Sequence, residues 1–196
     1  MRYLICLVSA ISSPAMASCP TGADLATGIR FETADGEWEI YRQVKPDVVE
    51  ALYHFNATEA MRNVLVKGIY LTEVVDLENG SPVPTTRSVY TYPVLPEDMP
   101  MPTPNGKWKT GATVLSTEGM SFEGQTYSFG DFAPHRIGDC TYQMMPIEVS
   151  YTVHEEETDS IDYVHWLPEL GLAYLAGGKT GDEIDTYVFT DISAVK

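Results

Sequence analysis

Short runs in which apolar and polar residues alternate make up most of the chain, and turn residues separate them. Residues 28–33 and 37–42 are two such runs, and Asp35-Gly36 lies between them. An Asp-Gly pair between alternating runs is a strong signal for a β-hairpin. Successive side chains of a strand point to opposite faces. We therefore expect the bulky apolar residues of this hairpin to share one buried face: Ile29, Phe31, Trp38 and Ile40.

Further alternating runs follow, and only residues 58–62 suggest a helical turn. Residues 63–77 predict one long, bent strand with a bulge at Gly68. Residues 146–153 predict a strand with one apolar face, which comprises Ile147, Val149, Tyr151 and Val153. The other runs predicted as strands are 48–55, 86–92, 107–116, 121–129, 136–142, 162–166, 170–176 and 183–190. About eleven short strands separated by turns are typical of an all-β domain.

The order of these runs predicts an antiparallel, strongly curved sheet, as a half-barrel or an open barrel. A two-sheet sandwich is the alternative, and the residue pattern does not separate the two. Residues 93–106 interrupt the pattern with five prolines, which prevent regular strand pairing. We expect this segment to form a long surface crossover or lid within a single β-rich domain of residues 18–196.

Residues 1–17 have the parts of a secretory signal peptide: a cationic start at Arg2, an apolar run over residues 3–11 and the small-residue pattern Ala15-Met16-Ala17. The apolar run is shorter than the roughly 20 residues that span a bilayer. We therefore expect cleavage between Ala17 and Ser18 and a periplasmic or secreted protein without a transmembrane segment. A buried N-terminal strand is the alternative interpretation of the same residues.

Cleavage at that point would leave two cysteines, Cys19 and Cys140. An even number of cysteines in an oxidising compartment predicts a disulfide between them. A second interpretation is that residues 16–19, Met-Ala-Ser-Cys, resemble a bacterial lipobox, whose cysteine carries a lipid. Lipidation would use the Cys19 sulfur and leave Cys140 as a free thiol, so the two interpretations exclude each other.

The chain is strongly acidic, with 12 Lys and Arg against 28 Asp and Glu, a formal charge of −16 and a pI near 4.4. This balance argues against nucleic acid as a partner, because phosphate binding needs a clustered basic face. It argues equally against electrostatic docking on anionic lipid. Hydrophobic residues make up 44% of the chain, which is enough for a packed core.

Candidate metal ligands are sparse in the sequence. His154 and His165 could approach each other across a hairpin of residues 147–166, but no third ligand stands at a zinc-like interval. A loop centred near Thr158 would instead place His154 opposite Asp162. One acidic cluster would offer calcium several oxygens, although a solvated loop is the simpler interpretation; it comprises Glu155, Glu156, Glu157, Asp159 and Asp162. We expect no cofactor and no metal.

Motifs of nucleophilic catalysis are also missing, since G-x-S-x-G does not occur. His135 precedes Cys140 at an odd spacing, which along one strand would place the two side chains on opposite faces. We therefore interpret Cys140 as structural and predict no catalytic residue.

The phrase Trp166-Leu167-Pro168-Glu169-Leu170-Gly171-Leu172 is typical of a hairpin in which Gly171 takes a positive φ. Together with residues 137–142, Ile-Gly-Asp-Cys-Thr-Tyr, it resembles uncharacterised exported, periplasmic β-rich bacterial proteins that are similar to half-barrel lipoprotein carriers. The resemblance covers residues 136–176. It implies a concave apolar sheet face of the kind that holds acyl chains, and it carries over no catalytic residue.

Two states of the concave face stay open at this point: an empty cavity, or one filled by tyrosines and by Trp38, Trp108 and Trp166. We expect a non-enzymatic domain that binds a hydrophobic small molecule or an envelope protein, or that serves a structural role. An exported hydrolase and a lipid-anchored envelope lipoprotein are the alternatives. Titratable side chains converging in the largest concavity would favour a hydrolase, whereas an apolar, aromatic cavity would favour binding.

Overall fold

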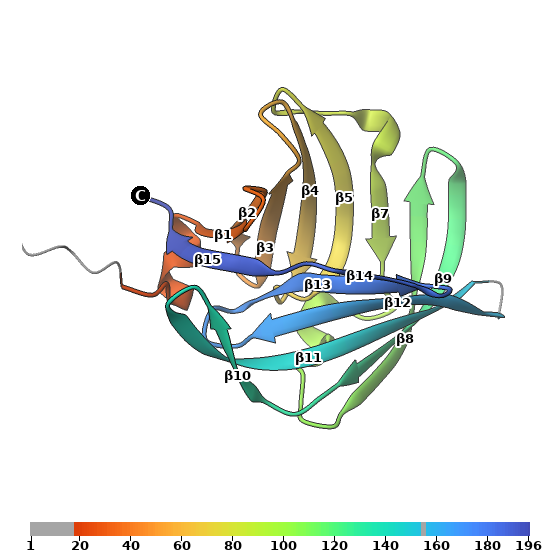
Figure 1. The fold of residues 1–196 in the computed structure, drawn as a ribbon. Coiled ribbons are helices and arrows are strands. Elements are labelled where there is room, and N and C mark those ends of the chain that lie inside the picture. The colour runs from red at the N-terminus through yellow and green to blue at the C-terminus, as the bar shows by residue number, and fades with distance from the viewer. Residues whose placement is uncertain (1–17, 154–155) are drawn as a thin grey trace, which may run out of the picture.

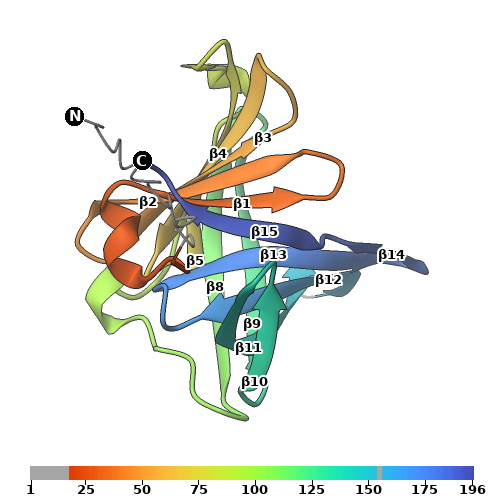
Figure 2. The same ribbon diagram turned by 60° about the vertical axis from the view of Figure 1, so that its left-hand side comes forward.

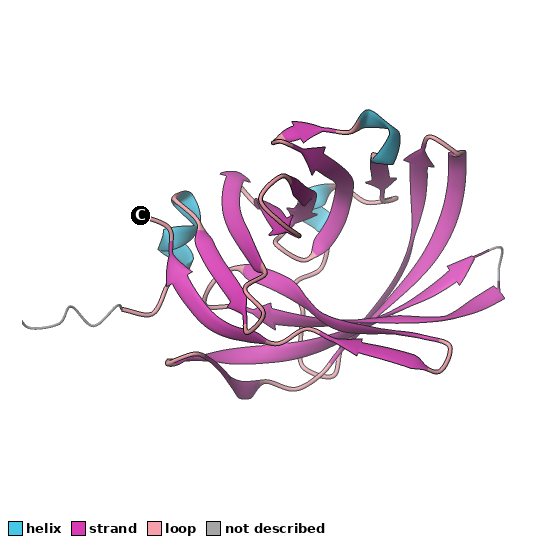
Figure 3. Ribbon diagram, turned by 45° about the horizontal axis from the view of Figure 1, so that its top comes forward, coloured by secondary structure: helices cyan, strands magenta, loops and turns pink. Residues whose placement is uncertain are grey.

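The computed structural model describes residues 18–153 and 156–196, and over these residues the fold is all-β, with 64% strand and 6% helix. Fifteen strands form one large antiparallel sheet that curves strongly and does not close (Figure 1). The predicted fold class is confirmed. Figure 3 shows how far the strands bend and how little helix accompanies them. The described residues include no helix that is long and apolar enough to cross a membrane.

The strands are β1 (Ile29–Thr33), β2 (Trp38–Lys45), β3 (Val48–His54), β4 (Glu59–Val66), β5 (Tyr70–Glu78), β6 (Ser81–Pro82), β7 (Ser88–Thr91), β8 (Lys107–Ser116), β9 (Gly119–Phe129), β10 (Ala133–Ile137), β11 (Cys140–Val153), β12 (Glu156–Leu167), β13 (Leu172–Thr180), β14 (Glu183–Thr186) and β15 (Phe189–Ala194). The short 3-10 helices are η1 (Gly22–Ala26), η2 (Pro84–Thr86) and η3 (Pro96–Asp98). Their order in the sheet is β14-β13-β12-β11-β9-β8-β7-β5-β4-β3-β2-β1-β15, with β10 beside β11 and β6 beside β5.

The two ends of this sheet come from one stretch of chain. β14 pairs with β13, and after residues 187–188 the chain continues as β15, which pairs with β1. Figure 2 shows β15 running beside β1 and continuing into β14 beside β13. This continuity brings the β1 side of the sheet round toward β13, so that the sheet folds over its own inner face.

Buried side chains form two clusters. The first brings residues of β1, β2 and β15 against residues of β10, β11 and β13; its centre is Phe31, whose ring lies 5.2–5.6 Å from the rings of Tyr41, Tyr174 and Phe189. The second brings β5, β8 and β9 against β11 and β12, and includes Tyr70, Tyr127 and Trp166. T-shaped and tilted aromatic pairs of this kind add to the free energy gained from apolar burial.

The first hairpin forms as predicted, but its register differs from the expected one. Residues 34–36 form its loop, because the amide of Thr33 donates to the carbonyl of Glu37. In this register Phe31 pairs with Glu39 and Ile29 pairs with Tyr41. A shift of one residue turns every side chain of a strand to the other face. Glu39 and Tyr41 therefore lie on the inner face in place of the two predicted apolar residues.

Trp38 and Ile40 lie on the outer face of the hairpin, so the prediction that they share the buried face with Phe31 is wrong. Trp38 pairs in register with Glu32 and stacks on His54, with 3.5 Å between the ring centroids. The guanidinium of Arg30 lies 4.6 Å from the Trp38 ring centroid, as a cation–π pair. Contacts with two polar neighbours replace core packing for this tryptophan.

The predicted helical turn at residues 58–62 is also wrong, because β4 begins at Glu59. The predicted single strand over residues 63–77 is two strands, β4 and β5, joined by a tight turn at Lys67 and Gly68. Gly68 has φ +68°, and a Cβ there would lie 2.3 Å from the carbonyl oxygen of Gly171. Its carbonyl accepts from the amide of Ala173 at 2.7 Å. Gly68 therefore serves the packing of this turn against the Gly171 hairpin, not a bulge.

The predicted hairpin at Gly171 forms. β12 ends at Leu167, β13 begins at Leu172, and Gly171 has φ +72°. The proline-rich segment, residues 93–106, joins β7 to β8 and contains η3 but no strand. Lys67 Nζ donates to the carbonyls of Glu97 and Met99, and the Tyr70 hydroxyl donates to Pro100. These bonds hold the proline-rich segment against the start of β5 and the turn before it.

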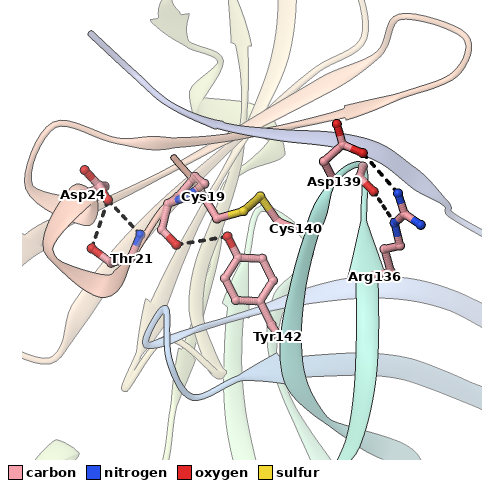
Figure 4. Close-up of a disulfide and its surroundings, with 9 residues drawn as sticks. Cys19, Thr21, Asp24, Arg136, Asp139, Cys140 and Tyr142 are labelled. Atoms are coloured by element: carbon pink, nitrogen blue, oxygen red, sulfur yellow. Dashed lines mark hydrogen bonds and ion pairs between the residues drawn. A yellow bond between two sulfur atoms is a disulfide. The ribbon is translucent and has the colours of Figure 1, made fainter. Parts of the chain in front are cut away.

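Cys19 and Cys140 form the predicted disulfide, with 5.5 Å between their Cα atoms (Figure 4). It joins the segment before η1 to the start of β11. Beside it, the Tyr142 hydroxyl donates to the carbonyl of Pro20 at 3.0 Å. The bond uses the sulfur that a lipid on Cys19 would need, so the structure is incompatible with the lipobox interpretation. The predicted signal peptide, including Ala17, lies outside the described residues.

Candidate functional site

The inner face of the curved sheet lines a cavity of about 640 Å³ that is open to solvent. Side chains from β2–β5, β7, β9 and β11–β13 line it, together with Tyr187 between β14 and β15. Its volume lies within the range of about 300–1,000 Å³ that is common for small-molecule sites. The tryptophans do not fill it: Trp38 lies on the outer face, while Trp108 and Trp166 pack in the second buried cluster.

Most of the cavity wall is aromatic or aliphatic. Seven of the described lining residues are tyrosines: Tyr41, Tyr53, Tyr90, Tyr127, Tyr151, Tyr174 and Tyr187. The apolar lining residues are Ala51, Phe55, Met61, Leu65, Ile69, Leu71, Ile147, Val149, Val164, Ala173 and Leu175. The predicted inner face of β11 is confirmed for Ile147, Val149 and Tyr151. Such a wall suits the apolar or aromatic body of a small molecule.

Three carboxyl groups interrupt this wall, those of Glu39, Glu123 and Asp162, and no Lys, Arg or His is among the described lining residues. Glu39 accepts a hydrogen bond from the Tyr41 hydroxyl, and burial raises the pKa of Glu39 to about 7. Asp162 accepts from the Tyr151 hydroxyl at 2.5 Å, and burial raises its pKa as well. The cavity therefore holds three acidic groups, and no cation among the described lining residues balances them in their ionised form.

Asn63 of β4 is a further polar residue of the cavity lining. Its Oδ1, however, is shielded from solvent and accepts no hydrogen bond from the described residues. Because solvent does not reach this oxygen, it lies within the packed wall and does not face the open space of the cavity. Asn63 pairs with Ala51, and Ala51 pairs with Tyr41, so the three side chains share one face of the sheet. A buried acceptor without a donor costs about 1–3 kcal/mol.

The raised pKa of Glu39 makes a pH-dependent contribution to stability. A carboxyl whose pKa is higher in the folded state stabilises the protein fully below its unfolded pKa of about 4.5, and this contribution is lost as the pH rises through 7. At pH 8 we expect Glu39→Gln to unfold at a higher urea concentration than the natural protein. Its free energy of unfolding should be higher by on the order of 2 kcal/mol after allowance for solvent screening. At pH 5 the two proteins should differ little. A stability difference that is equal at both pH values would contradict the assigned burial of this carboxyl.

A second hollow of about 380 Å³ lies beside the first and shares Tyr174 with it. The Tyr174 hydroxyl lies 2.9 Å from His165 Nδ1 and 2.8 Å from His135 Nε2. Burial, with a smaller effect of His135, lowers the pKa of His165 to about 4, so this ring is neutral at pH 7. A hydroxyl can donate to one ring and accept from the other. The two histidines thus hold the tyrosine that separates the hollows.

The sequence also allows His165 to approach His154, although a loop centred near Thr158 places His154 opposite Asp162 instead. His154 lies outside the described residues, and His165 pairs in register with Pro146. Val153 pairs with Glu156 and Thr152 pairs with Glu157, so the expected loop centre near Thr158 is wrong. Turn position fixes which residues of two strands face each other.

Of the proposed calcium cluster, the structure describes one side chain, that of Asp162. Glu155 lies outside the described residues; Glu156, Glu157 and Asp159 belong to β12 by backbone, and their side chains are not described. The expectation of a loop is wrong from Glu156 onward, because β12 begins there. Asp162 bonds to Tyr151 at the cavity. Within the described part of the chain, no group of three or more His, Cys, Asp and Glu could hold a metal ion.

His135 and Cys140 lie on different strands, β10 and β11, and His135 pairs with Tyr142. The predicted strand over residues 136–142 is wrong because Gly138, with φ +58°, turns the chain there. The conclusion that Cys140 is structural agrees with its disulfide.

Comparison of the chain with models of known protein families, with curated protein sequences and with solved structures finds no match. The fold and the site together define an open, curved antiparallel sheet around an acidic, tyrosine-rich internal cavity.

Proposed function

We propose that this protein is an exported, non-enzymatic binding protein that holds a hydrophobic small molecule in the cavity of its curved sheet. The supporting observation is the cavity of about 640 Å³ with its aromatic and aliphatic wall. Burying the apolar surface of a ligand against such a wall gains roughly 25 cal/mol per Å². The resemblance of residues 136–176 to half-barrel lipoprotein carriers leads to the same expectation.

The positions of the titratable groups favour binding over hydrolysis. Hydrolysis of an ester or amide needs a nucleophile and a base within hydrogen-bond distance at one cleft. His135 and His165 line the second hollow and bond to Tyr174. In the larger cavity, the Glu39 and Asp162 carboxyls each accept from a neighbouring tyrosine. These groups orient side chains of the wall.

Export is supported by two features of the chain. Residues 1–17 have the signal-peptide pattern, and the Cys19–Cys140 disulfide is a cross-link that persists in oxidising compartments such as the periplasm. Mature protein purified from its own cells should therefore begin at Ser18. Native mass spectrometry should give the mass of residues 18–196 with the disulfide intact and a bound small molecule in addition. A mature chain that retains residues 1–17 would contradict export.

Filling the cavity should abolish binding without unfolding the protein. Ala51 lines the cavity between Tyr41 and Asn63, and Ala51→Trp adds an indole to the cavity wall at this position. We expect Nile red, a neutral hydrophobic dye, to bind the natural protein with a rise in fluorescence and to bind Ala51→Trp at least about tenfold more weakly, a difference of about 1.4 kcal/mol.

Ala34→Trp is the matched control, since Ala34 is exposed in the loop of the first hairpin and lies away from the cavity. Its affinity for Nile red should equal that of the natural protein. Urea unfolding of both variants checks that each is folded. If Ala51→Trp is folded and binds the dye as tightly as Ala34→Trp does, the cavity is not the binding site.

A further inference from the structure

We propose that the ligand of this cavity is a protonated organic amine, whose apolar part lies against the tyrosines and whose ammonium group lies near the carboxyl groups of the wall. This inference rests on the proposed binding function and names the chemical class of the ligand. It differs from the expectation for half-barrel carriers of acyl chains, because it selects a cation and excludes a fatty acid.

The first argument for an amine comes from the charges of the cavity wall. Glu39 comes from β2, whereas Glu123 and Asp162 come from β9 and β12, farther along the curved sheet. The described lining residues include no Lys, Arg or His that could balance a bound carboxylate. Bringing an anion next to like charges in a partly dehydrated site is unfavourable, whereas an ammonium group gains from each of them.

The tyrosines supply the second step. A cation is attracted to the electron-rich face of an aromatic ring, and cavities that combine several rings with carboxylates are suited to ammonium ligands. Seven tyrosines line this cavity, and two of them, Tyr41 and Tyr151, already donate their hydroxyl protons to Glu39 and Asp162. These two hydroxyl protons already bond within the wall. The carboxyl oxygens of the wall therefore remain as acceptors for a ligand.

Outside the cavity, the net charge of the chain also favours a cationic ligand. A formal charge of −16 gives the protein a negative field that attracts small cations and slows the approach of anions. A metal cation does not fit these observations as well, because the described residues hold no cluster of metal-binding side chains, and tyrosine rings do not coordinate hard cations.

The test compares three probes with the same apolar chain and different head groups: decylamine, decanol and decanoate. Each is titrated into the purified protein by isothermal calorimetry at pH 8, where the amine is cationic and the Glu39 carboxyl is largely ionised. We expect decylamine to bind about tenfold or more tightly than decanol, and decanoate to bind most weakly. Decanoate binding as tightly as decylamine would overturn the amine inference and leave the proposed function in place. Failure of all three probes would contradict both.

A pair of substitutions then tests the role of the carboxyl groups. Glu39→Gln combined with Asp162→Asn keeps the shape of both side chains and their capacity to accept from Tyr41 and Tyr151. We expect this variant to lose about tenfold or more in decylamine affinity and to keep its decanol affinity within about twofold. The control is Glu50→Gln on β3, which does not line the cavity and should leave both affinities unchanged. Equal losses for both probes would show that the carboxyls only support the wall, and the inference would be wrong.

Discussion

Removal of the disulfide is expected to lower the free energy of unfolding by about 3–5 kcal/mol. Cys19 and Cys140 are separated by 121 residues, and closing so long a loop removes much of the conformational freedom of the unfolded chain. Folded domains are stable by only about 5–15 kcal/mol. The loss is therefore a large fraction of the total, and the variant should be partly unfolded at moderate temperature.

The measurement is urea unfolding of the natural protein and of a variant with Cys19→Ser and Cys140→Ser. A reducing agent is the control, since it should lower the midpoint of the natural protein to that of the double variant and leave the double variant unchanged. If reduction does not move the midpoint of the natural protein, the cross-link does not contribute to its stability.

The N-terminal segment has further contacts that the disulfide variant should retain in part. The amide of Gly22 donates to the carbonyl of Glu169 at 3.0 Å, and Leu25 of η1 is buried in the first cluster. Tyr142 binds the carbonyl of Pro20. These contacts dock η1 on the hairpin that contains Gly171, so the cysteine variants should lose stability mainly through the unfolded state.

Truncation of Phe31 is expected to have an effect of similar size. Phe31 is fully buried, and its ring contacts those of Tyr41, Tyr174 and Phe189. Phe31→Ala should lower the free energy of unfolding by about 3–5 kcal/mol, through lost apolar burial and the void that remains. Because Tyr41 and Tyr174 also line the cavity, Nile red should bind the folded fraction of this variant more weakly.

Phe122→Ala on β9 provides the comparison, since Phe122 is 64% exposed to solvent. Its cost should stay below about 1 kcal/mol. Urea unfolding of the two variants gives the difference directly. Equal destabilisation by both substitutions would mean that the rings around Phe31 do not form the centre of the core.

Much of the fold follows from local pattern alone. Alternation over residues 146–153 predicts the inner face of β11, because every second side chain of a strand shares one face. The Gly171 hairpin is predicted by its Pro and Gly, whose backbone preferences hold in most contexts. The disulfide is predicted by the cysteine count once the predicted signal peptide is set aside. Each of these features depends on residues that are close in sequence or few in number.

The candidate site could not be predicted from such patterns, because it depends on the register between strands. Glu39 faces the cavity only because the loop of the first hairpin has three residues, and a loop of two would place Ile40 there instead. The contact of His135 with His165 through Tyr174 joins β10, β12 and β13, which no local spacing reveals. The turn at Gly68 is fixed by a close approach to Gly171, far along the chain.

The pairing of β1 with β15 has a kinetic consequence. Thr190 of β15 bonds to the carbonyl of Glu32 across 158 residues of sequence, so one edge of β1 stays unpaired until the chain as far as β15 has been synthesised. Contacts of such long range slow folding, and a shorter nascent chain keeps an open strand edge that can pair with other chains. A polypeptide with this topology would remain unfolded for longer after synthesis than one in which every strand pairs with a near neighbour in sequence.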